Sequence, residues 1–359
     1  MKQSYLILAA LVLFISCKKK VEQTTESQEQ PAPDFVVAFG SCNMSQEPNP
    51  FWDDILAENP DVWIWGGDIV YADTDDVERL RTIYAMQDTV AGYAKLRKEV
   101  PIIGTWDDHD FGVNDGGSDF AIKAESQQVF LDFMGVPEDS ERRNQEGVYA
   151  SHDYEVPAGK VKVIILDTRY FRSELIKDED SNRRYKPTMD STATILGNAQ
   201  WEWFGKELKE SDADFNLIMS SIQVLSGEHG FETWGNFPLE VEKLEDIITQ
   251  SGAKGVIILS GDRHISEFSR ADVDGLSYPL VDFTSSGLTH SYFSFSGEPN
   301  QHRVGEVVSD KSYGIINLNI EEKRAEFKIM GDNGTVLQEL KQSYWALYLG
   351  RKSLSLRKI

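Results

Sequence analysis

Short runs of apolar, β-favouring residues recur along the chain, and each run ends abruptly in small or polar residues. Runs of this kind, bounded by turn residues, are typical of buried strands. The pattern predicts strands at residues 35–39, 62–65, 101–103, 161–166, 215–219 and 256–259. Nearer the C-terminus, residues 313–320 and 325–330 flank a charged turn and are expected to form a closing hairpin.

Several segments between these runs carry apolar residues at steps of three and four, which places them on one face of a helix. Helices are therefore expected at residues 50–58, 77–98, 120–133, 198–210 and 239–250. Residues 173–194 and 287–303 lack this period and are expected to be loops, the second near the site. Strands that alternate with helices favour an α/β fold with a largely parallel sheet.

The N-terminus carries a lysine and then an apolar run over residues 5–15, which is too short to span a bilayer and is typical of a signal peptide. Residues 13–17 resemble a bacterial lipobox, which implies a signal peptide over residues 1–16 and lipidation of Cys17. A plain secretory signal with an incidental cysteine is the alternative. We expect a polar, lipidated tether over residues 17–33, one compact domain over 34–340 and a tail over 341–359.

The charge balance narrows the classes of partner. The 359 residues include 36 Lys and Arg against 59 Asp and Glu, a formal net charge of −23. Such a surface disfavours binding to duplex nucleic acid and electrostatic docking on anionic lipid. An enzyme of this charge that acts on anions needs local cations at its site.

Side chains with metal-binding chemistry follow the ends of several predicted strands. They are Cys42; Asp68 and Tyr71; Asp107, Asp108 and His109; Asp262 and His264. Each group alone has a plainer interpretation, such as a turn, a surface loop or a small core residue. Together they lie where α/β folds bind ligands, at the carboxyl ends of strands.

Carboxylates that crowd together need cations at neutral pH, and a two-metal site able to bind a phosphate ester meets that need. Thiolate and phenolate ligands suit a transition metal such as iron, whereas an all-oxygen site suits calcium, magnesium or manganese. The ligand types therefore predict two unlike metal ions.

Four motifs stand in the order of the metallophosphoesterase blocks: Phe-Gly-Ser-Cys at residues 39–42, Gly-Asp-Ile-Val-Tyr at 67–71, Thr-Trp-Asp-Asp-His-Asp at 105–110 and Ser-Gly-Asp-Arg-His at 260–264. With this set the chain resembles the PhoD-type alkaline phosphatases over about residues 34–320. The resemblance implies a metallophosphoesterase-like β-sandwich of mixed sheets flanked by helices, with the active site at the C-terminal ends of the strands.

The resemblance also implies the chemistry. A metal-activated hydroxide at a dinuclear site would hydrolyse phosphomonoesters, phosphodiesters or both. An Fe(III) ion would be held by Cys42, Asp68, Tyr71 and His264. A Ca²⁺ ion, or another divalent ion, would be held by Asp68, Asp108 and Asp262, with Asp107 as a ligand or an orienting group.

Further residues have expected roles around the substrate. His109 would protonate the leaving alkoxide or position a phosphoryl oxygen, and Asp110 would orient its imidazole. Arg169 is a candidate phosphate clamp, because arginine offers bidentate donors, with an ion pair as the alternative role. Asn114 is a candidate substrate contact or an ordinary turn residue.

Two other functions stay open: a phosphodiesterase or phospholipase acting on lipid or nucleic-acid fragments, and a non-catalytic lipoprotein that binds a ligand. The expected partners are a phosphate-ester substrate and a membrane reached through the lipid anchor, and the protein is expected to be a monomer. We expect an exported lipoprotein of the bacterial cell envelope, on the periplasmic or outer-surface face. The additional N-terminal β-domain found in many PhoD enzymes is expected to be absent.

Overall fold

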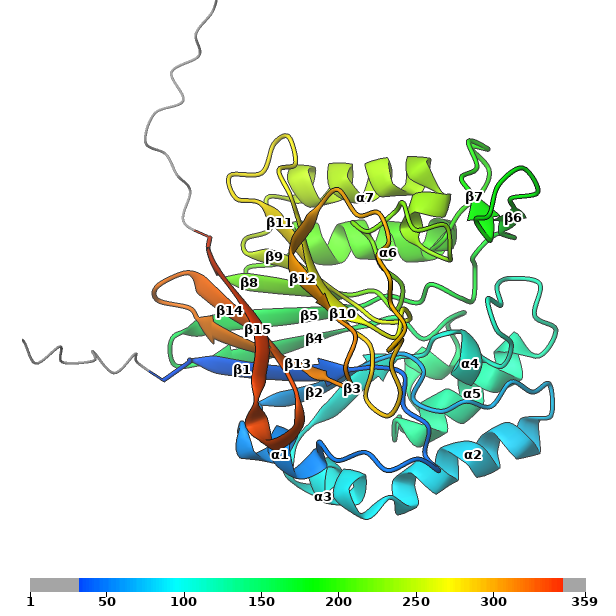
Figure 1. Ribbon diagram of the computed structural model, residues 1–359, viewed down its shortest axis with the longest axis horizontal. Helices are drawn as coiled ribbons and strands as arrows, with labels where there is room; N and C mark the ends of the chain where they lie inside the picture. Colours follow the sequence, from blue (N-terminus) through cyan, green and yellow to red (C-terminus); the bar gives the residue numbers. More distant parts are fainter. Residues whose placement is uncertain (1–31, 345–359) are drawn as a thin grey trace, which may run out of the picture. The chain divides into compact units, whose positions relative to one another are not determined.

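The computed structural model describes residues 32–344, which form two large mixed sheets packed face to face between helices (Figure 1). The first sheet has the spatial order β15 (Val336–Ser343), β14 (Arg324–Met330), β13 (Tyr313–Asn319), β1 (Phe35–Gly40), β2 (Val62–Gly66) and β3 (Ile102–Thr105). The second has the order β12 (Arg303–Val308), β10 (Ser266–Ala271), β11 (Leu280–Ser285), β9 (Val256–Ser260), β8 (Phe215–Met219), β5 (Gly159–Ile165) and β4 (Ala150–Val156). The predicted sandwich of mixed sheets flanked by helices is confirmed.

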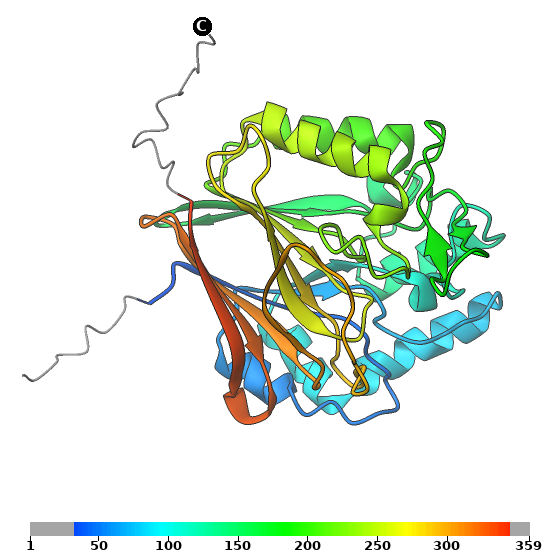
Figure 2. The ribbon, with the colours of Figure 1, turned by 45° about the horizontal axis from the view of Figure 1, so that its top comes forward.

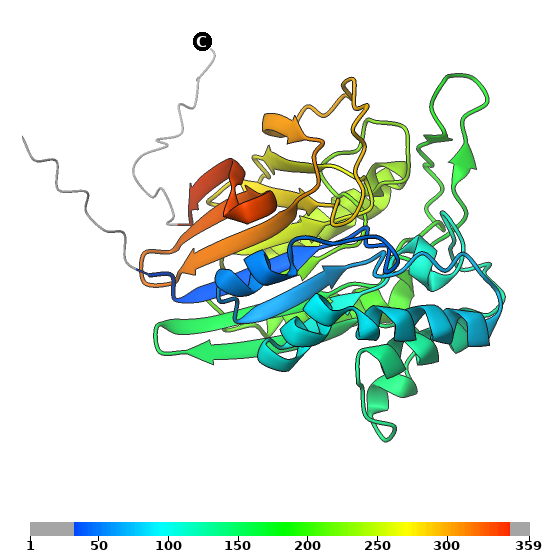
Figure 3. The same ribbon diagram turned by 60° about the horizontal axis from the view of Figure 1, so that its bottom comes forward.

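Helices cover the outer face of each sheet. On the first sheet lie α1 (Trp52–Ala57), α2 (Val77–Thr89), α3 (Ala91–Glu99), α4 (Asp108–Phe111) and α5 (Lys123–Phe133), which come forward in Figure 3. On the second lie α6 (Gly197–Lys209) and α7 (Pro238–Ser251), at the top of Figure 2. Short 3₁₀ turns span Glu141–Arg143, Trp234–Asn236 and Asp332–Gly334. The single helix expected over 77–98 is wrong, because Val90 adopts an extended ψ of 114° that separates α2 from α3.

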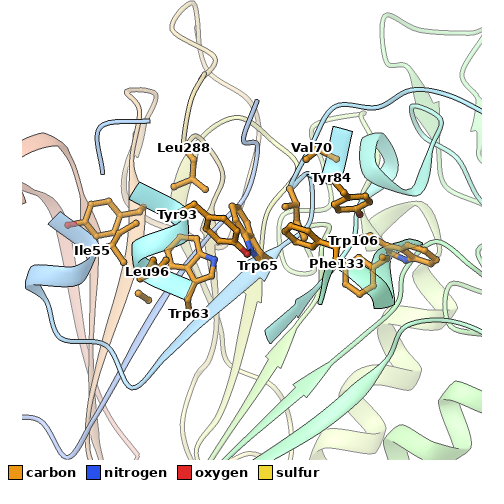
Figure 4. Packing of buried hydrophobic residues seen from close by; sticks show 14 of the residues in the cluster. Ile55, Trp63, Trp65, Val70, Tyr84, Tyr93, Leu96, Trp106, Phe133 and Leu288 are labelled. Carbon is orange, nitrogen blue, oxygen red and sulfur yellow. The ribbon is translucent and has the colours of Figure 1, made fainter. Parts of the chain in front are cut away.

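Strand β2 shows why the central strands are apolar without interruption. Successive side chains of a strand point to opposite faces, so Val62 and Ile64 pack between the two sheets. Trp63 and Trp65 point the other way and pack beneath the helices, with ring centroids 5.3 Å apart. Figure 4 shows both indoles beside Tyr93 of α3. Burial on both faces accounts for the unbroken apolar run of β2.

Several strands were not expected, and polarity explains one of them. Strand β10 carries Ser266, Glu267 and Ser269, which are buried in the second sheet. Glu267 is compensated there by Arg303 of β12, whose Nε donates to Oε2 at 2.6 Å. A buried ion pair across neighbouring strands leaves no apolar run in the sequence.

The segment 173–194, expected to be a loop throughout, contains a small hairpin of β6 (Ile176–Lys177) and β7 (Tyr185–Lys186). Two-residue strands are too short to show a hydrophobic period. The closing hairpin is confirmed as β13 and β14, and β15 extends this sheet to Ser343.

The predicted signal peptide and the lipidation of Cys17 fall outside the described residues, as do most of the tether and the tail. Between residues 32 and 344, no helix is both long enough and apolar enough to cross a membrane.

Candidate metal centre

The first cluster of candidate ligands joins the ends of β1, β2 and β9. A thiol, a carboxylate and an imidazole from Cys42, Asp68 and His264 have ligand atoms within 4.8 Å of one another. The Tyr71 hydroxyl donates to Oδ2 of Asp68 at 3.1 Å and lies 3.0 Å from Nε2 of His264. The structure thus brings together all four residues expected to hold the first ion.

The second cluster consists of carboxylates alone. Asp107, Asp108 and Asp262 approach one another within the same limit, and Asp68 forms a further group with Asp108 and His109. Asp68 therefore lies between the two clusters, where a bridging ligand would be needed. The residues expected to hold the second ion are thus also brought close together.

Two carboxylate oxygens support the presence of cations. Oδ1 of Asp68 and Oδ2 of Asp107 are buried and have no hydrogen-bond partner among the described residues. A buried acceptor without a partner is costly, and a buried anion is costlier still. Bound cations would supply the missing partners, so these residues fit a metal centre.

The pKa shifts of the candidate ligands also indicate that cations are needed among them. Burial, followed by the charges of Asp108 and Asp107, raises the pKa of Asp68 well above its ordinary value. Burial and Asp107 do the same to the pKa of Asp262. Burial and the charge of Asp68 also raise the pKa of the Cys42 thiol. Cations between these groups would reverse the shifts and keep the ligands ionised.

The backbone of the ligand loops is unusual in the same places. Cys42, Asp68, Asp262 and His264 have positive φ angles of 59°, 48°, 68° and 55°. Residues with a Cβ rarely adopt this left-handed conformation, and strain of this kind gathers at functional sites. The tight turns direct ligand side chains from separate strands toward one point.

Arg169 is buried beneath the centre instead of lining it. Its Nε donates to Oδ1 of Asp107 at 2.6 Å, and its Nη1 donates to Glu232 at 2.6 Å. Glu232 also pairs with Nε of Arg172 at 2.8 Å. This geometry favours the ion-pair role over the phosphate clamp. Asp107, which also accepts from Ser221 at 2.8 Å, keeps its second oxygen free to act as a ligand.

Asp110 has a different role from the one expected. Its carboxylate accepts the backbone N–H groups of Asp107, Asp68 and Ile69 at 2.6, 3.2 and 3.0 Å. Asp110 is the third residue of α4, and a reciprocal capping box with Asp107 draws its side chain back to the start of the helix. Asp110 therefore ties two ligand loops together and does not orient the imidazole of His109.

The imidazole is oriented by Asp73, which the sequence analysis missed. Nδ1 of His109 lies 2.8 Å from Oδ1 of Asp73. Burial disfavours the charged imidazolium, but the bond to Asp73 and the charge of Asp108 outweigh it and raise the pKa of His109. Asp73 stands in an acidic stretch with no recognisable motif, so only its position two residues after Tyr71 could have pointed to it.

His290 is a further neighbour of the ligands. Its Nε2 lies 3.0 Å from the hydroxyl of Tyr71. The residue comes from the loop expected near the site, where it could line the cavity or be solvated.

A cavity of about 430 Å³ opens over both clusters. Asp68, Asp108, Asp262, His109 and His264 line it. Asn114 lines it too. The cationic side chains in its wall are Arg184 and Arg263.

Comparison with known proteins agrees with this geometry. A family model described as PhoD-like phosphatase matches residues 35–346. Alkaline phosphatase D of Bacillus subtilis (strain 168) is 24% identical over 285 residues, 67% of this chain and 48% of the relative. The chain therefore spans about half the length of that curated relative.

Solved structures share the fold. A structure of PhoD superposes with a TM-score of 0.67 at 18% identity, covering 88% of this chain and 69% of that one. A dimetal phosphatase from Danio rerio has a TM-score of 0.53 at 15% identity, covering 87% and 99%. GAP50, the anchor in the inner membrane complex of Plasmodium, has a TM-score of 0.56 at 12% identity, covering 86% and 89%.

Proposed function

Since the chain belongs to the PhoD-like phosphatase family, we propose that it is a metal-dependent hydrolase that releases phosphate from phosphomonoesters, phosphodiesters or both. One observation carries the proposal: two clusters of candidate metal ligands line one open cavity, and Asp68 of the first cluster also lies beside Asp108 of the second. This spacing suits two ions that bind one phosphoryl group between them.

The chemistry of the donors supports two unlike ions. Cys42, Tyr71 and His264 together with Asp68 would hold Fe(III), because thiolate and phenolate are ligands for a transition metal. Asp108 and Asp262, with Asp68 and the free oxygen of Asp107, would hold Ca²⁺ or another divalent ion in an all-oxygen site. When bound, the ions supply Lewis-acid polarisation of a phosphoryl oxygen and lower the pKa of water.

The protein's own residues supply the proton and the orientation. Asp73 engages Nδ1 of His109, so Nε2 is left to donate a proton to the oxygen of the departing alcohol. Asn114, in the cavity wall, can donate to a phosphoryl oxygen. Glu232 and Arg169 hold Asp107 at the edge of the carboxylate cluster.

Anchoring at the cell envelope belongs to the same proposal. The supporting observation is the short apolar run ending in Ser16 and Cys17. Metabolic labelling with palmitate would test it, with Cys17→Ser as the matched variant. We expect label on the parent alone. An unlabelled parent, or equal label on both, would contradict lipidation at Cys17.

Turnover itself is tested with p-nitrophenyl phosphate and bis(p-nitrophenyl) phosphate, using the purified chain supplied with iron and calcium between about pH 6 and pH 11. We expect activity that a chelator removes and that Asp68→Ala lacks. The ratio of the two rates distinguishes a monoesterase from a diesterase. A folded, metal-loaded protein that hydrolyses neither substrate would contradict the proposal and favour a binding role.

A further inference from the structure

A second cavity of about 470 Å³ borders the one over the metal centre, and the two share Arg184 and Phe231 in their walls. Its remaining wall includes Arg183, Glu228 and His229. The two arginines come from the turn between β6 and β7, the hairpin that projects from the rest of the fold in Figure 3. We refer to this cavity, with Arg183, Arg184 and His229, as the arginine pocket.

Arg183 brings an uncompensated cation to the arginine pocket. Its side chain is exposed, and among residues 32–344 its guanidinium has no ion-pair partner. Its stem packs so closely on Gly230 that a Cβ there would lie 2.6 Å from Cγ of Arg183. Gly230 also has a φ of 84°, in the left-handed region that favours glycine. Both the backbone conformation and the lack of space for a Cβ therefore favour glycine at this position. Local structure thus holds the arginine against the cavity wall.

His229 contributes a buried donor. Only 8% of the residue is exposed, and its Nδ1 accepts the backbone N–H of Phe231 at 3.1 Å. A neutral imidazole that accepts through Nδ1 carries its proton on Nε2. That Nε2 is buried and has no partner among the described residues. Burial and the charges of the nearby Arg263 and Arg303 lower the pKa of His229 to about 3, so the ring stays neutral.

The acidic groups nearby are already engaged. Glu228 accepts the backbone N–H of Gln301 at 2.8 Å. Both carboxylate oxygens of Glu298 accept from Nη2 of Arg263, at 2.9 and 2.8 Å. Asp115 pairs with Arg184 and takes up part of its charge. What stays available to a ligand is the exposed guanidinium of Arg183, which is a donor for an oxyanion.

We propose that the arginine pocket binds a second phosphate group of the substrate, so that favoured substrates carry one phosphate on each side of the alcohol that is released. This inference rests on the proposed phosphoesterase function. The scissile phosphate would occupy the metal centre, and the alcohol would cross the shared wall of Arg184 and Phe231. Arg183 would bind the second phosphate through parallel N–H groups.

The test compares paired substrates with the full chain loaded with metal. The pairs are the mono- and bisphosphates of hexane-1,6-diol and, as a shorter reference, of propane-1,3-diol, with phosphate release as the readout. Two equivalent ends alone would raise kcat/KM about twofold. One charge-assisted contact adds about ten- to a hundredfold, and we expect this preference for the longer bisphosphate.

Variants assign the preference to the pocket. Arg183→Ala should raise KM for the bisphosphate about tenfold or more and leave kcat/KM for the monophosphate within about twofold. Arg183→Lys should keep part of the preference. Arg79→Ala, which removes an exposed arginine from α2, should change neither substrate.

The outcomes separate the two proposals. Equal kcat/KM for the mono- and bisphosphate in an active enzyme would overturn the inference and leave the phosphoesterase function standing. A preference that survives in Arg183→Ala would overturn the assignment to this pocket. Failure to hydrolyse any of the substrates, together with failure on the p-nitrophenyl esters, would overturn the proposed function instead.

Discussion

The carboxylate of Asp73 holds the imidazole of His109 through Nδ1, at distances of 2.8 and 2.9 Å from its two oxygens. The backbone reinforces this pair, because the N–H groups of Ala72 and Asp73 lie within 3.3 Å of the carbonyl oxygen of His109. The loop after β2 and the first turn of α4 are thereby joined twice. The ring orientation is set before any substrate arrives, as a proton donor to the leaving group requires.

Replacing Asp73 with Asn tests this pairing. The variant should lower kcat about ten- to a hundredfold for alkyl phosphates, whose alkoxides need a proton to depart. Because Asp73 raises the pKa of His109, its removal lowers that pKa, and the loss of activity at alkaline pH should begin at a lower pH. A pH–rate profile measures the shift. Asp76→Asn, which preserves the cap of α2, is the control.

A comparison of two leaving groups makes the Asp73→Asn experiment more specific. p-Nitrophenolate departs without protonation, so Asp73→Asn should affect p-nitrophenyl phosphate less than an alkyl phosphate. An equal loss on both substrates would indicate a structural defect and would contradict a role in holding the proton donor.

Asp68→Asn should remove both metal ions together. Asp68 belongs to the first cluster and also approaches Asp108 of the second, so we expect metal content to fall at both sites and turnover to drop below about 1% of the parent. In the metal-free state the same change relieves carboxylate crowding, so the variant should unfold at a higher temperature than the metal-free parent. Elemental analysis and thermal unfolding with chelator measure the two effects, with the exposed Asp139→Asn as control. Retained activity would rule out the bridging position.

The proposed iron site makes an optical prediction. Phenolate and thiolate bound to Fe(III) absorb visible light by charge transfer, so the iron-loaded parent should be coloured. Tyr71→Phe and Cys42→Ser should each change or remove part of the band. Absorption spectra at matched iron content provide the measurement. A colourless iron-loaded parent would exclude both residues as ligands to that ion.

Glu232→Gln should destabilise the fold strongly. Glu232 is 2% exposed and faces the guanidinium groups of Arg169 and Arg172. Removing its charge leaves two buried cations partly unpaired, at a cost of about 3–5 kcal/mol in the free energy of unfolding. Denaturant titration measures the difference. Asp53→Asn, which breaks an exposed pair with Lys95, should change it by less than about 1 kcal/mol. Equal effects would contradict the buried network.

The lowered pKa of His152, on β4, predicts that the fold loses stability in acid. Burial and the charge of Arg142 lower the pKa of His152 from 6.5 to about 4. Between these values the unfolded chain binds a proton that the folded chain does not, so the stability present above pH 6.5 is lost as the pH falls toward 4. His152→Gln should reduce this fall by about 1–3 kcal/mol, and urea unfolding across that interval would show it. Parallel pH dependences of parent and variant would contradict the shift.

Much of the fold could be read from local pattern. The buried strands β1, β2 and β9 are apolar runs, and the turns that follow them carry the candidate ligands Cys42, Asp68, Asp262 and His264. Two features of the fold could not be predicted from local pattern. The apolar pattern continues through Val90 as one helical period, although the helix ends there. In β10 the buried Glu267, which pairs with Arg303 36 residues away, interrupts the apolar run that would have marked a strand.

By itself, the sequence determined the class of fold and the chemical types of the candidate ligands. Burial on both faces favours an apolar run in a strand, and the type of each thiol, phenol, imidazole or carboxylate group at a strand end indicates which metals it can bind. The tertiary structure alone decided which of these groups touch. Asp107 and Arg169 are 62 positions apart, yet they share a buried bond, and Arg183 reaches the pocket only through the β6–β7 turn. Such pairings follow from how distant loops pack at one sheet edge, and that packing depends on contacts across the whole fold, which no local pattern records.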